Sequence, residues 1–594
     1  MTVLPPIARP SYPQGSEDSP LATIRGGSVK SGVATMIFQV DAADPHAHLA
    51  SLGRSSQLAL GWKKRFIIQA FGFVYRLSRP PEEIGYTNIS TSFPLKEDRI
   101  HKKKLTRTYC KRIFGKSRGG SLTMTLPWSM VFGAFFGALL ALICVLAMAL
   151  LFARPVIQWG MKRFVTRLMS DRYPENIWEM ITAMIRVNPR IVMENSLRAA
   201  SGSIIERPFG SPRKFLSFDG LIFSPAQLAT LPTPEFHPVD TRLIIGPRAR
   251  RPLILDIPIL AGAMGYGVGV TEQVKVAIAK GTAAVGTATN SGEGPFLPEE
   301  REFARFYILQ YSTGEWAKEP SILQNADAIE IHIGQGATAA AASFIPPEHL
   351  QGRARELLGV PHDDVLVVPS RHSDINKPED LRSLVQRLRD MTGGVPIGIK
   401  ICASGKLESD LEIAIEAGVD FISLDGGQAG TKGGAPILED DFGMPTIFAL
   451  SRTISYLRKR GVKEEITLLS GGGYAVPGDC LKAIALGADG VYMGTALLWA
   501  MTHDQVTKTI PWEPPTELTS YSGAFQDEFD QDEAAFYLEN FLRSFTEEMK
   551  VAVRALGKTS IREVNAEDLI ALDEWTSKVT KVRLAHLPHE PVSS

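Results

Sequence analysis

The sequence predicts an α/β protein: a parallel (β/α)8 TIM barrel with an N-terminal transmembrane helix and a helical C-terminal extension. Three observations predict it. Short apolar runs alternate with amphipathic stretches over about 250 residues, which is typical of a parallel sheet with crossover helices and of the usual size of this barrel. One long run without charged residues lies before this region, and a stretch with helical periodicity follows it.

The chain divides by composition into five expected segments. The first is rich in proline, serine and arginine and carries no recognisable motif, so we expect it to be disordered or a mispredicted extension. The segments are an N-terminal extension (1–123), a transmembrane helix (124–153), a helical linker leading into the barrel (154–250), the barrel (251–500) and a helical C-terminal region (501–594).

The run from 126 to 153 contains no charged residue, and about 20 apolar residues already cross the hydrocarbon core of a membrane as a helix. Trp128 and Trp159 lie near its two expected interfaces, where tryptophan is enriched in membrane proteins. A buried core helix is the alternative, and the length of the run disfavours it. We therefore expect a membrane anchor at residues 126–153.

The basic residues around this run bear on its orientation. Lysine and arginine lie on both sides of it, and for the whole chain the positive-inside rule puts the N-terminus in the cytoplasm and the large domain outside. Met124 directly precedes the run, and a translation start there leaves basic residues only after the helix. We expect this start, and with it a single-pass protein of the cell membrane whose barrel lies in the cytoplasm.

Charge and cysteine content exclude two classes of function. Lysine plus arginine and aspartate plus glutamate both number 64, so no basic excess points to a nucleic acid partner. The four cysteines are far apart in the sequence and form no C-x-x-C pair, so we expect no metal site. They are Cys110, Cys144, Cys402 and Cys480.

Eight apolar runs are expected to form the strands, and that number favours a closed barrel over a doubly wound sheet. A dinucleotide-binding sheet would need a G-x-G-x-x-G turn, and the nearest match, at 265–269, has the wrong spacing. The expected strands are 257–263, 283–286, 328–333, 365–368, 396–401, 421–424, 466–469 and 490–493.

Glycine-rich segments lie where several expected strands end. In such barrels these ends carry the functional loops, and the loops after the seventh and eighth strands often bind phosphate through backbone N–H groups. Each loop alone could be a tight turn, but five at one rim indicate a phosphorylated ligand, because backbone without a Cβ atom can approach phosphate closely. The segments are 261–265, 289–294, 425–431, 470–473 and 493–496.

One lysine, Lys400, lies inside an expected barrel strand. A buried ammonium group is costly unless it meets an anion or an electron-rich ring. Two interpretations stay open: contact with a bound ligand, or a structural salt bridge within the barrel.

Seven motifs, spread over about residues 215–500, occur in the order seen in the FMN-binding domain of glutamate synthases, and the chain resembles that family. Their order is more specific than any one of them. The resemblance implies the barrel fold, FMN as cofactor and a small-molecule substrate. The motifs are AGAMGYGVG, TNSGEG, NADAIEIHIGQGA, GIKICASG, DGGQAGTKGGAP, SGGGY and GADGVYMGTA.

The resemblance also implies site residues. Glu293, Glu330 and Gln335 would serve catalysis on the substrate side of the flavin. For His332, where the family has a lysine, two interpretations stay open: a catalytic acid, base or conditional cation, or a structural histidine at the end of its strand. Lys400 would contact the N1/O2 edge of the flavin and stabilise its reduced form. The residues that would hold FMN are Gly262, Ala263, Met264, Gly265, Thr289, Asn290, Lys400, Asp425, Gly426, Gly427, Gly430, Thr431, Ser470, Gly471, Gly472, Gly473, Gly494 and Thr495.

The family reaction transfers a hydride from reduced FMN to 2-iminoglutarate and forms glutamate. This chain departs from the family at His332 and Thr338, where the family has lysines, and it has no cluster cysteines after the eighth strand and no glutaminase segment. We therefore expect FMN binding to be retained, glutamine-dependent synthesis to be absent, and a separate protein to donate electrons.

Three functions remain open at this point. The first is an FMN oxidoreductase acting on an amino or imino acid such as glutamate or 2-iminoglutarate. The second is an FMN dehydrogenase of another substrate, coupled to a membrane electron carrier. The third is a flavin-binding barrel without catalysis, used as a scaffold.

Overall fold

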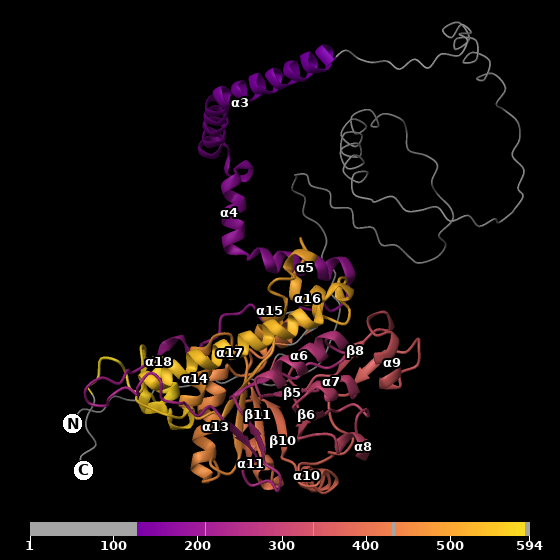
Figure 1. Ribbon diagram of the computed structural model, residues 1–594, viewed down its shortest axis with the longest axis vertical. Coiled ribbons are helices and arrows are strands. Elements are labelled where there is room, and N and C mark those ends of the chain that lie inside the picture. The colour runs from indigo at the N-terminus through magenta and orange to yellow at the C-terminus, as the bar shows by residue number, and fades with distance from the viewer. Residues whose placement is uncertain (1–127, 208–209, 337, 431–433, 589–594) are drawn as a thin grey trace, which may run out of the picture. The chain divides into compact units, whose positions relative to one another are not determined.

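The computed structural model describes residues 128–207, 210–336, 338–430 and 434–588 (Figure 1). The chain divides into two units, Met1–Ile143 and Cys144–Ser594. The expected extension 1–123, the translation start at Met124 and the site residue Thr431 lie outside the described residues.

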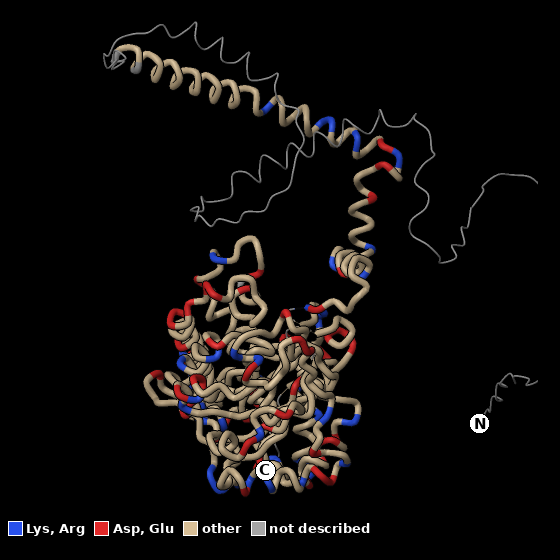
Figure 2. The backbone as a smooth tube through the Cα atoms, turned by 90° about the vertical axis from the view of Figure 1, so that its right-hand side faces the viewer, with Lys and Arg blue, Asp and Glu red and all other residues tan. Residues whose placement is uncertain are grey.

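The first described element is a single long helix, α3 (Trp128–Ser170). It contains both the uncharged run and the basic stretch that follows, and it continues through Pro155. Its apolar side chains are exposed, for example Phe135 at 63% and Leu151 at 73%. Among the described residues, this one helix is long and apolar enough to cross a membrane, and charged residues are confined to its second half (Figure 2).

Two further helices, α4 (Ile177–Arg186) and α5 (Pro189–Ser201), follow. Each begins at an asparagine whose side chain accepts a hydrogen bond from the first helical turn, Asn176 for α4 and Asn188 for α5. The chain then becomes irregular, apart from the strand β1 (Leu221–Phe223), which pairs with the late strand β14 (Leu569–Ala571).

Eight parallel strands form the barrel, in the order β4-β13-β12-β11-β10-β7-β6-β5. The ends of this order meet, since Thr287 Oγ1 donates to Ile259 O (2.6 Å) and Asp256 N donates to Gly286 O (2.8 Å). The fold class predicted from the sequence is confirmed. The strands are β4 (Ile259–Ala261), β5 (Ala288–Asn290), β6 (Phe306–Tyr311), β7 (Ala328–His332), β10 (Ile397–Cys402), β11 (Phe421–Asp425), β12 (Thr467–Gly471) and β13 (Gly490–Met493).

Two of the expected strands are wrong. Residues 283–286 form the end of α6 and a turn, and the second strand is β5, five residues later. Residues 365–368 do form a strand, β9 (Leu366–Val368), but it pairs antiparallel with β8 (Ser343–Ile345) outside the barrel. The third barrel strand is β6, which was not expected. A short apolar run does not distinguish a strand from the end of a helix, which explains the first error, and it does not show its pairing partner, which explains the second.

The barrel interior has an apolar lower layer and a polar upper layer. At the N-terminal mouth the hairpin β2 (Leu243–Ile245) and β3 (Leu253–Leu255) packs against inward-facing residues of the strands. Above it, at the C-terminal ends, the inward positions are polar or charged. The packed strand residues of the lower layer include Leu260, Ala288, Ile308, Ala328, Phe421 and Leu469.

Helices surround the strands (Figure 1). The C-terminal helix α17 (Gln531–Ala555) lies against α6 so closely that a Cβ atom on Gly281 would meet Leu538 at 2.9 Å. This confirms the expected helical C-terminal extension. The other helices are α6 (Glu272–Ala284), α7 (Pro298–Phe303), α8 (Pro320–Leu323), α9 (Gly352–Leu358), α10 (Asp380–Met391), α11 (Leu407–Ala417), α12 (Pro436–Asp441), α13 (Thr446–Arg460), α14 (Pro477–Leu486), α15 (Thr495–Thr502), α16 (Pro514–Thr519) and α18 (Glu574–Thr580).

Candidate functional site

The polar upper layer is organised around Glu330, whose side chain is fully buried. Each of its two carboxylate oxygens accepts two hydrogen bonds. Because the four donors come from four other strands, this one carboxylate fixes the relative positions of β5, β6, β11 and β13 at the level of the site. The donors are Asn290 Nδ2 (3.0 Å), Gln310 Nε2 (2.9 Å), Ser423 Oγ (2.5 Å) and Tyr492 OH (3.2 Å).

Lys400 lies on the neighbouring strand, where its Cα pairs in register with that of His332. Its Nζ atom is 3.2 Å from Asp425 Oδ2 and 5.9 Å from the centre of the Tyr492 ring. Burial alone lowers the pKa of an amine, but the carboxylates of Asp425 and Glu330 outweigh this effect, and the pKa of Lys400 is raised. The buried cation expected from the sequence is therefore present, and its partner within the protein is Asp425.

His332 ends strand β7 at the mouth of the barrel, and only 7% of it is exposed. Neither ring nitrogen has a hydrogen-bond partner within the described residues, although Nδ1 lies 3.4 Å from Glu293 Oε1. His372 Nε2 donates to the His332 carbonyl at 2.7 Å, and burial lowers the pKa of His372. His332 thus offers two unused ring nitrogens beside a carboxylate.

Gln335, which was expected to serve catalysis, lies in the loop after His332. Its backbone N–H donates to Ala339 O (2.9 Å). Gly336 approaches the next loop, since a Cβ atom there would meet Gly426 O at 2.1 Å.

Most of the glycines that were expected to hold a phosphate lie too close to neighbouring protein atoms to carry a side chain. A Cβ atom on Gly471 would meet Asp425 Oδ1 at 2.2 Å, and one on Gly265 would meet Glu293 O at 2.1 Å. Gly472 has a φ of +121°, which disfavours any side chain. These glycines therefore allow the loops to pack closely around the lumen. The sequence did not distinguish this packing role from phosphate binding.

Gly494 differs from these glycines. A Cβ atom on it would meet nothing within 4 Å. It precedes α15, whose N-terminus has no side-chain cap, and unpaired N–H groups at a helix N-terminus favour an anion. Strand register places Gly471 opposite Tyr492, two residues before Gly494, so the loops after the seventh and eighth strands meet. This is the open, donor-rich position expected for a phosphate.

Two predicted cofactor residues point their side chains away from the lumen. Thr289 Oγ1 donates to Glu300 Oε1 (2.9 Å), and Ser470 Oγ pairs with Tyr474 OH (2.8 Å). Both hydroxyls lie behind their strands, because side chains alternate between the two faces of a strand. Any contact they make with a ligand in the lumen would come from their backbone.

Behind β5, the buried Lys275 holds the loop that carries Asn290 and Glu293. Its Nζ atom donates to Asn290 O (2.8 Å) and Ser291 O (3.1 Å) and lies 2.8 Å from Glu300 Oε1. Three acceptors match the three protons of the ammonium group. This contact positions the loop and was not expected from the sequence.

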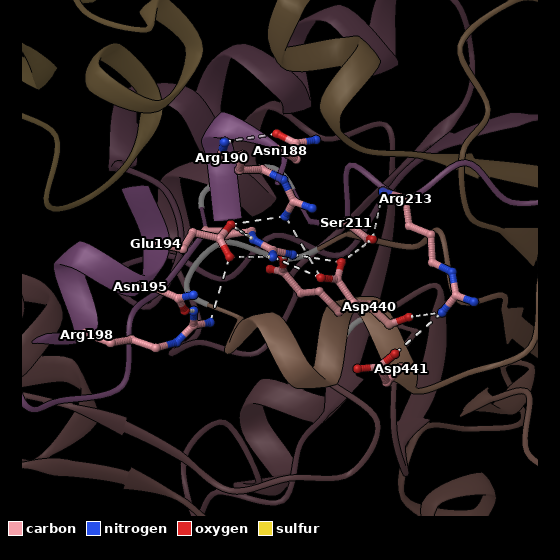
Figure 3. Close-up of polar contacts among 11 residues, drawn as sticks. Asn188, Arg190, Glu194, Asn195, Arg198, Ser211, Arg213, Asp440 and Asp441 are labelled. Carbon is pink, nitrogen blue, oxygen red and sulfur yellow. Dashed lines mark hydrogen bonds and ion pairs between the residues drawn. The ribbon is translucent and has the colours of Figure 1, made fainter. Parts of the chain in front are cut away.

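The loop after β11, which carries Gly426, Gly427 and Gly430, is tied to the linker. Arg207 donates to Asp440 (2.8 and 2.9 Å) and to Glu194 (2.9 and 3.1 Å), and its Nη1 lies 3.4 Å from the buried Glu439. Figure 3 shows this cluster, in which Glu194 from α5 and Asp440 from α12 converge. The linker therefore fixes one wall of the barrel mouth.

Ala263 and Met264 follow β4 at the same rim, and Met264 packs against the main core. Gly262 lies between them and β4, with a Cβ position 3.0 Å from Met493 O, and Thr495 begins α15. The structure thus brings the predicted residues that it describes to one end of the barrel, with Glu330, Lys400 and His332 inside and the glycines at the rim.

The family model for the conserved region in glutamate synthase matches residues 231–559. The chain belongs to the glutamate synthase family. A glutamate synthase large subunit-like protein of Rhizobium meliloti is 30% identical over 65% of this chain and 91% of its own length. An archaeal-type glutamate synthase [NADPH] of Thermotoga maritima is 29% identical over 65% of this chain and 82% of its own length.

Solved structures similar to this glutamate synthase family member include the flavin-binding domain of baker's yeast flavocytochrome b2 and the monotopic membrane protein (S)-mandelate dehydrogenase. The first is 18% identical with a TM-score of 0.39 and covers 63% of this chain and 80% of its own. The second is 13% identical with a TM-score of 0.39 and covers 59% and 88%. The family assignment rests on the sequence matches.

FMN is the cofactor of the conserved glutamate synthase barrel, and the residues present here fit it. An open helix N-terminus at Gly494 suits a phosphate, and the buried cation Lys400 suits an electron-rich ring system. The side chains of Gln310, Ser423 and Tyr492 complete the lumen but were not predicted. Tyr492 lies within one of the motifs that carried the resemblance. The alternation of side chains along its strand could have shown that it faces the lumen.

Proposed function

We propose that this FMN-dependent oxidoreductase transfers a hydride between FMN and an amino or imino acid such as glutamate or 2-iminoglutarate. The observation that supports the proposal is His332, a buried imidazole with both ring nitrogens free of hydrogen bonds within the described residues. It lies in register with Lys400 and 3.4 Å from Glu293. A proton-transfer group and a fixed cation thus lie on adjacent strands.

Oxidation of an amine removes a hydride from the carbon and a proton from the nitrogen, and bound FMN supplies the hydride acceptor. His332 takes the proton at a ring nitrogen, and Glu293 stabilises the imidazolium that forms. Lys400 holds positive charge in the lumen, and Glu330 keeps its four donors in place. In the reverse direction His332 returns the proton as a hydride is delivered to the imine carbon.

This chain departs from its family in the cation that would bind the substrate carboxylates. His332 stands where the sequence resemblance places a lysine, and it carries charge only when protonated. We therefore propose that the preferred substrate has fewer negative charges than glutamate, or that His332 is protonated when a dicarboxylate binds.

Anaerobic spectroscopy of the purified full-length protein tests the proposal. Oxidised flavin absorbs near roughly 370 and 450 nm. We expect an amino acid, screened first with glutamate, to bleach the longer-wavelength band, and the matching 2-oxo acid with ammonia to restore it. Colourless protein that takes up no FMN contradicts flavin binding. A flavin that only non-amine substrates reduce contradicts the amino-acid proposal and favours another dehydrogenase.

Variants of His332 connect this chemistry to the site. His332→Gln should slow flavin reduction by about 10²–10⁴-fold with unchanged FMN content, since it removes the proton acceptor. His332→Lys should lower the KM for glutamate relative to His332→Gln, because it supplies the fixed cation. The control is His503→Gln, on an exposed residue that makes an edge-to-face contact with Tyr537. Equal rates in all three variants would exclude His332 from proton transfer.

We also propose that α3 anchors the protein in the cell membrane as a single span with the barrel in the cytoplasm, and that a separate protein exchanges electrons with it. The apolar surface of α3 and the absence of a C-x-x-C pair from the sequence support these two points. The boundaries at 124–153, 154–250, 251–500 and 501–594 remain predictions.

A further inference from the structure

A cavity of about 960 Å³ lies on the outer side of β10, separate from the lumen. Its floor is formed by Ile399 and Ile401, which alternate along β10 with the inward-facing Lys400. Its sides come from Leu381 of α10 and Ile413 of α11. The residues that organise the lumen, such as Glu330, do not line it.

The lining is aliphatic rather than aromatic. Besides the four residues of the floor and sides, Ile333, Ile375 and Met444 contribute, and Phe442 is the aromatic residue that reaches it. Binding sites for small molecules usually measure about 300–1,000 Å³ and combine an apolar lining with a few polar groups that fix orientation. A cavity of this size and lining suits a flexible aliphatic chain better than a stack of flat rings.

Two basic residues, Arg371 and Lys377, line the cavity and are exposed. Neither forms an ion pair with another residue of the described ranges. The carboxylates of the lining are already engaged: Asp410 accepts from Ser404 Oγ (3.0 Å), and Asp441 lies 3.5 Å from Arg213. Two uncommitted cations at the edge of an apolar cavity favour a ligand with an anionic end.

One wall of the cavity is held in place before any ligand arrives. Residues 441–445 comprise the last residue of α12 and the four after it. Arg207 binds Asp440 of this helix, and Arg213 donates to the Asp440 carbonyl at 2.7 Å (Figure 3). A wall fixed in this way reduces the ordering that binding would otherwise require.

We propose that this cavity binds a single-chain anionic amphiphile. Its aliphatic chain lies along Ile399 and Ile401 between α10 and α11, and its carboxylate or phosphate group lies between Arg371 and Lys377. A free fatty acid and a lysophospholipid share this chemistry, and competition between them identifies the source.

Photolabelling of the full-length protein in its membranes tests the proposal without detergent. The probe is a palmitic acid with a diazirine at the chain end and an alkyne for recovery, and labelled peptides are mapped by mass spectrometry. We expect label on β10, α11 and Met444. Palmitate or palmitoyl lysophosphatidic acid should compete, whereas palmityl alcohol, which lacks the anion, should not.

Variants decide the assignment. Arg371→Glu combined with Lys377→Glu should reduce labelling of the cavity by about tenfold or more, because it removes two charge-assisted contacts. Ile413→Trp, at a partly buried position, should reduce it by filling the space. Lys459→Glu, an exposed cation of α13, is the matched control and should leave labelling unchanged. FMN content, measured in parallel, reports folding and keeps this test separate from the proposed function.

Three outcomes would overturn the proposal. They are label confined to α3, equal labelling in Arg371→Glu/Lys377→Glu and Lys459→Glu, and competition by decylubiquinone but not by palmitate. The last would assign the cavity to a ring-bearing electron carrier instead.

Discussion

Lys400 is a buried cation in the middle of a barrel strand, with the Asp425 carboxylate at 3.2 Å. The raised pKa that Asp425 and Glu330 produce against the effect of burial keeps its ammonium group charged over the physiological range. Lys400 is therefore a fixed positive charge in the polar layer.

Lys400→Met should lower the free energy of unfolding by about 3–5 kcal/mol, because it leaves the buried Asp425 carboxylate without its partner. Flavin reduction should slow by about 10²–10³-fold, the usual cost of removing one charge-stabilising donor. Urea unfolding and anaerobic reduction rates measure the two effects. Lys406→Met, at an exposed position six residues later, is the control. Unchanged stability in Lys400→Met would show that Asp425 is solvated.

The open position at Gly494 gives a sharper test of the phosphate site. Gly494→Ala should weaken FMN binding by about tenfold while the melting temperature without FMN stays unchanged, because the added Cβ atom meets no protein atom within 4 Å. Gly478→Ala, which also meets nothing within 4 Å, should leave the FMN affinity unchanged. Fluorescence titration with FMN measures the affinity. Equal FMN affinity in the two variants would place the phosphate elsewhere.

At the scale of single residues, the sequence predicted which charged residues are buried in the barrel where residue type and strand position agreed. Lys400 was predicted because a charged residue within an apolar strand needs a partner, and Glu330 was predicted from the family resemblance. The roles of Gln310 and Ser423 could not be predicted, because they depend on which strands are neighbours. The outward direction of Thr289 follows from the inward direction of Asn290, so alternation along β5 could have shown it.

Among the elements, β6 and β9 show what local composition cannot decide. Both are apolar runs, but β6 pairs with β5 and β7 inside the barrel, whereas β9 pairs with β8 outside it. Partner choice is a property of the whole sheet. Helix ends are different, because Thr271 caps the start of α6 and Gly418 ends α11, and such signals are local.

The contact between α5 and α12 has its own pH dependence. Burial raises the pKa of Glu439 to about 7, although Arg207 acts in the opposite direction, and the carboxylates of Asp440 and Glu194 face it as well. Between pH 4.5, its ordinary value, and about 7, the folded protein holds a proton that the unfolded chain has released. The stabilisation is complete below the lower value and is lost as pH rises through the higher one.

Glu439→Gln should therefore make the free energy of unfolding less dependent on pH. The fall in stability between pH 5 and 8 should shrink by about 1–3 kcal/mol, because the amide cannot release a proton. Urea unfolding at a series of pH values measures this. Glu416→Gln, at an exposed position of α11, should retain the wild-type dependence. A Glu439→Gln variant with an unchanged pH profile would show that Glu439 titrates normally.

For the whole molecule, the apolar surface of α3 has no counterpart in the packed barrel. Leu140 is 63% exposed and Leu146 54%, within a helix whose first half carries no charge. Leu140→Arg with Leu146→Arg should release the protein from membranes, since each arginine near the centre of a span costs about 2.5–3.5 kcal/mol. Alkaline carbonate extraction measures the release. Leu228→Arg, 93% exposed outside α3, should remain in the pellet. A double variant that stays membrane-bound would exclude α3 as the anchor.

The hairpin of β2 and β3 has a kinetic consequence. Because it seals one end of the barrel with packed leucine and isoleucine, every reactant must arrive and every product must depart through the opposite opening. Under the proposed function, the amine and the partner that accepts its electrons use this one entrance, so the first product has to leave before the second reactant enters. Turnover of this kind alternates between two half-reactions and gives parallel lines in double-reciprocal plots.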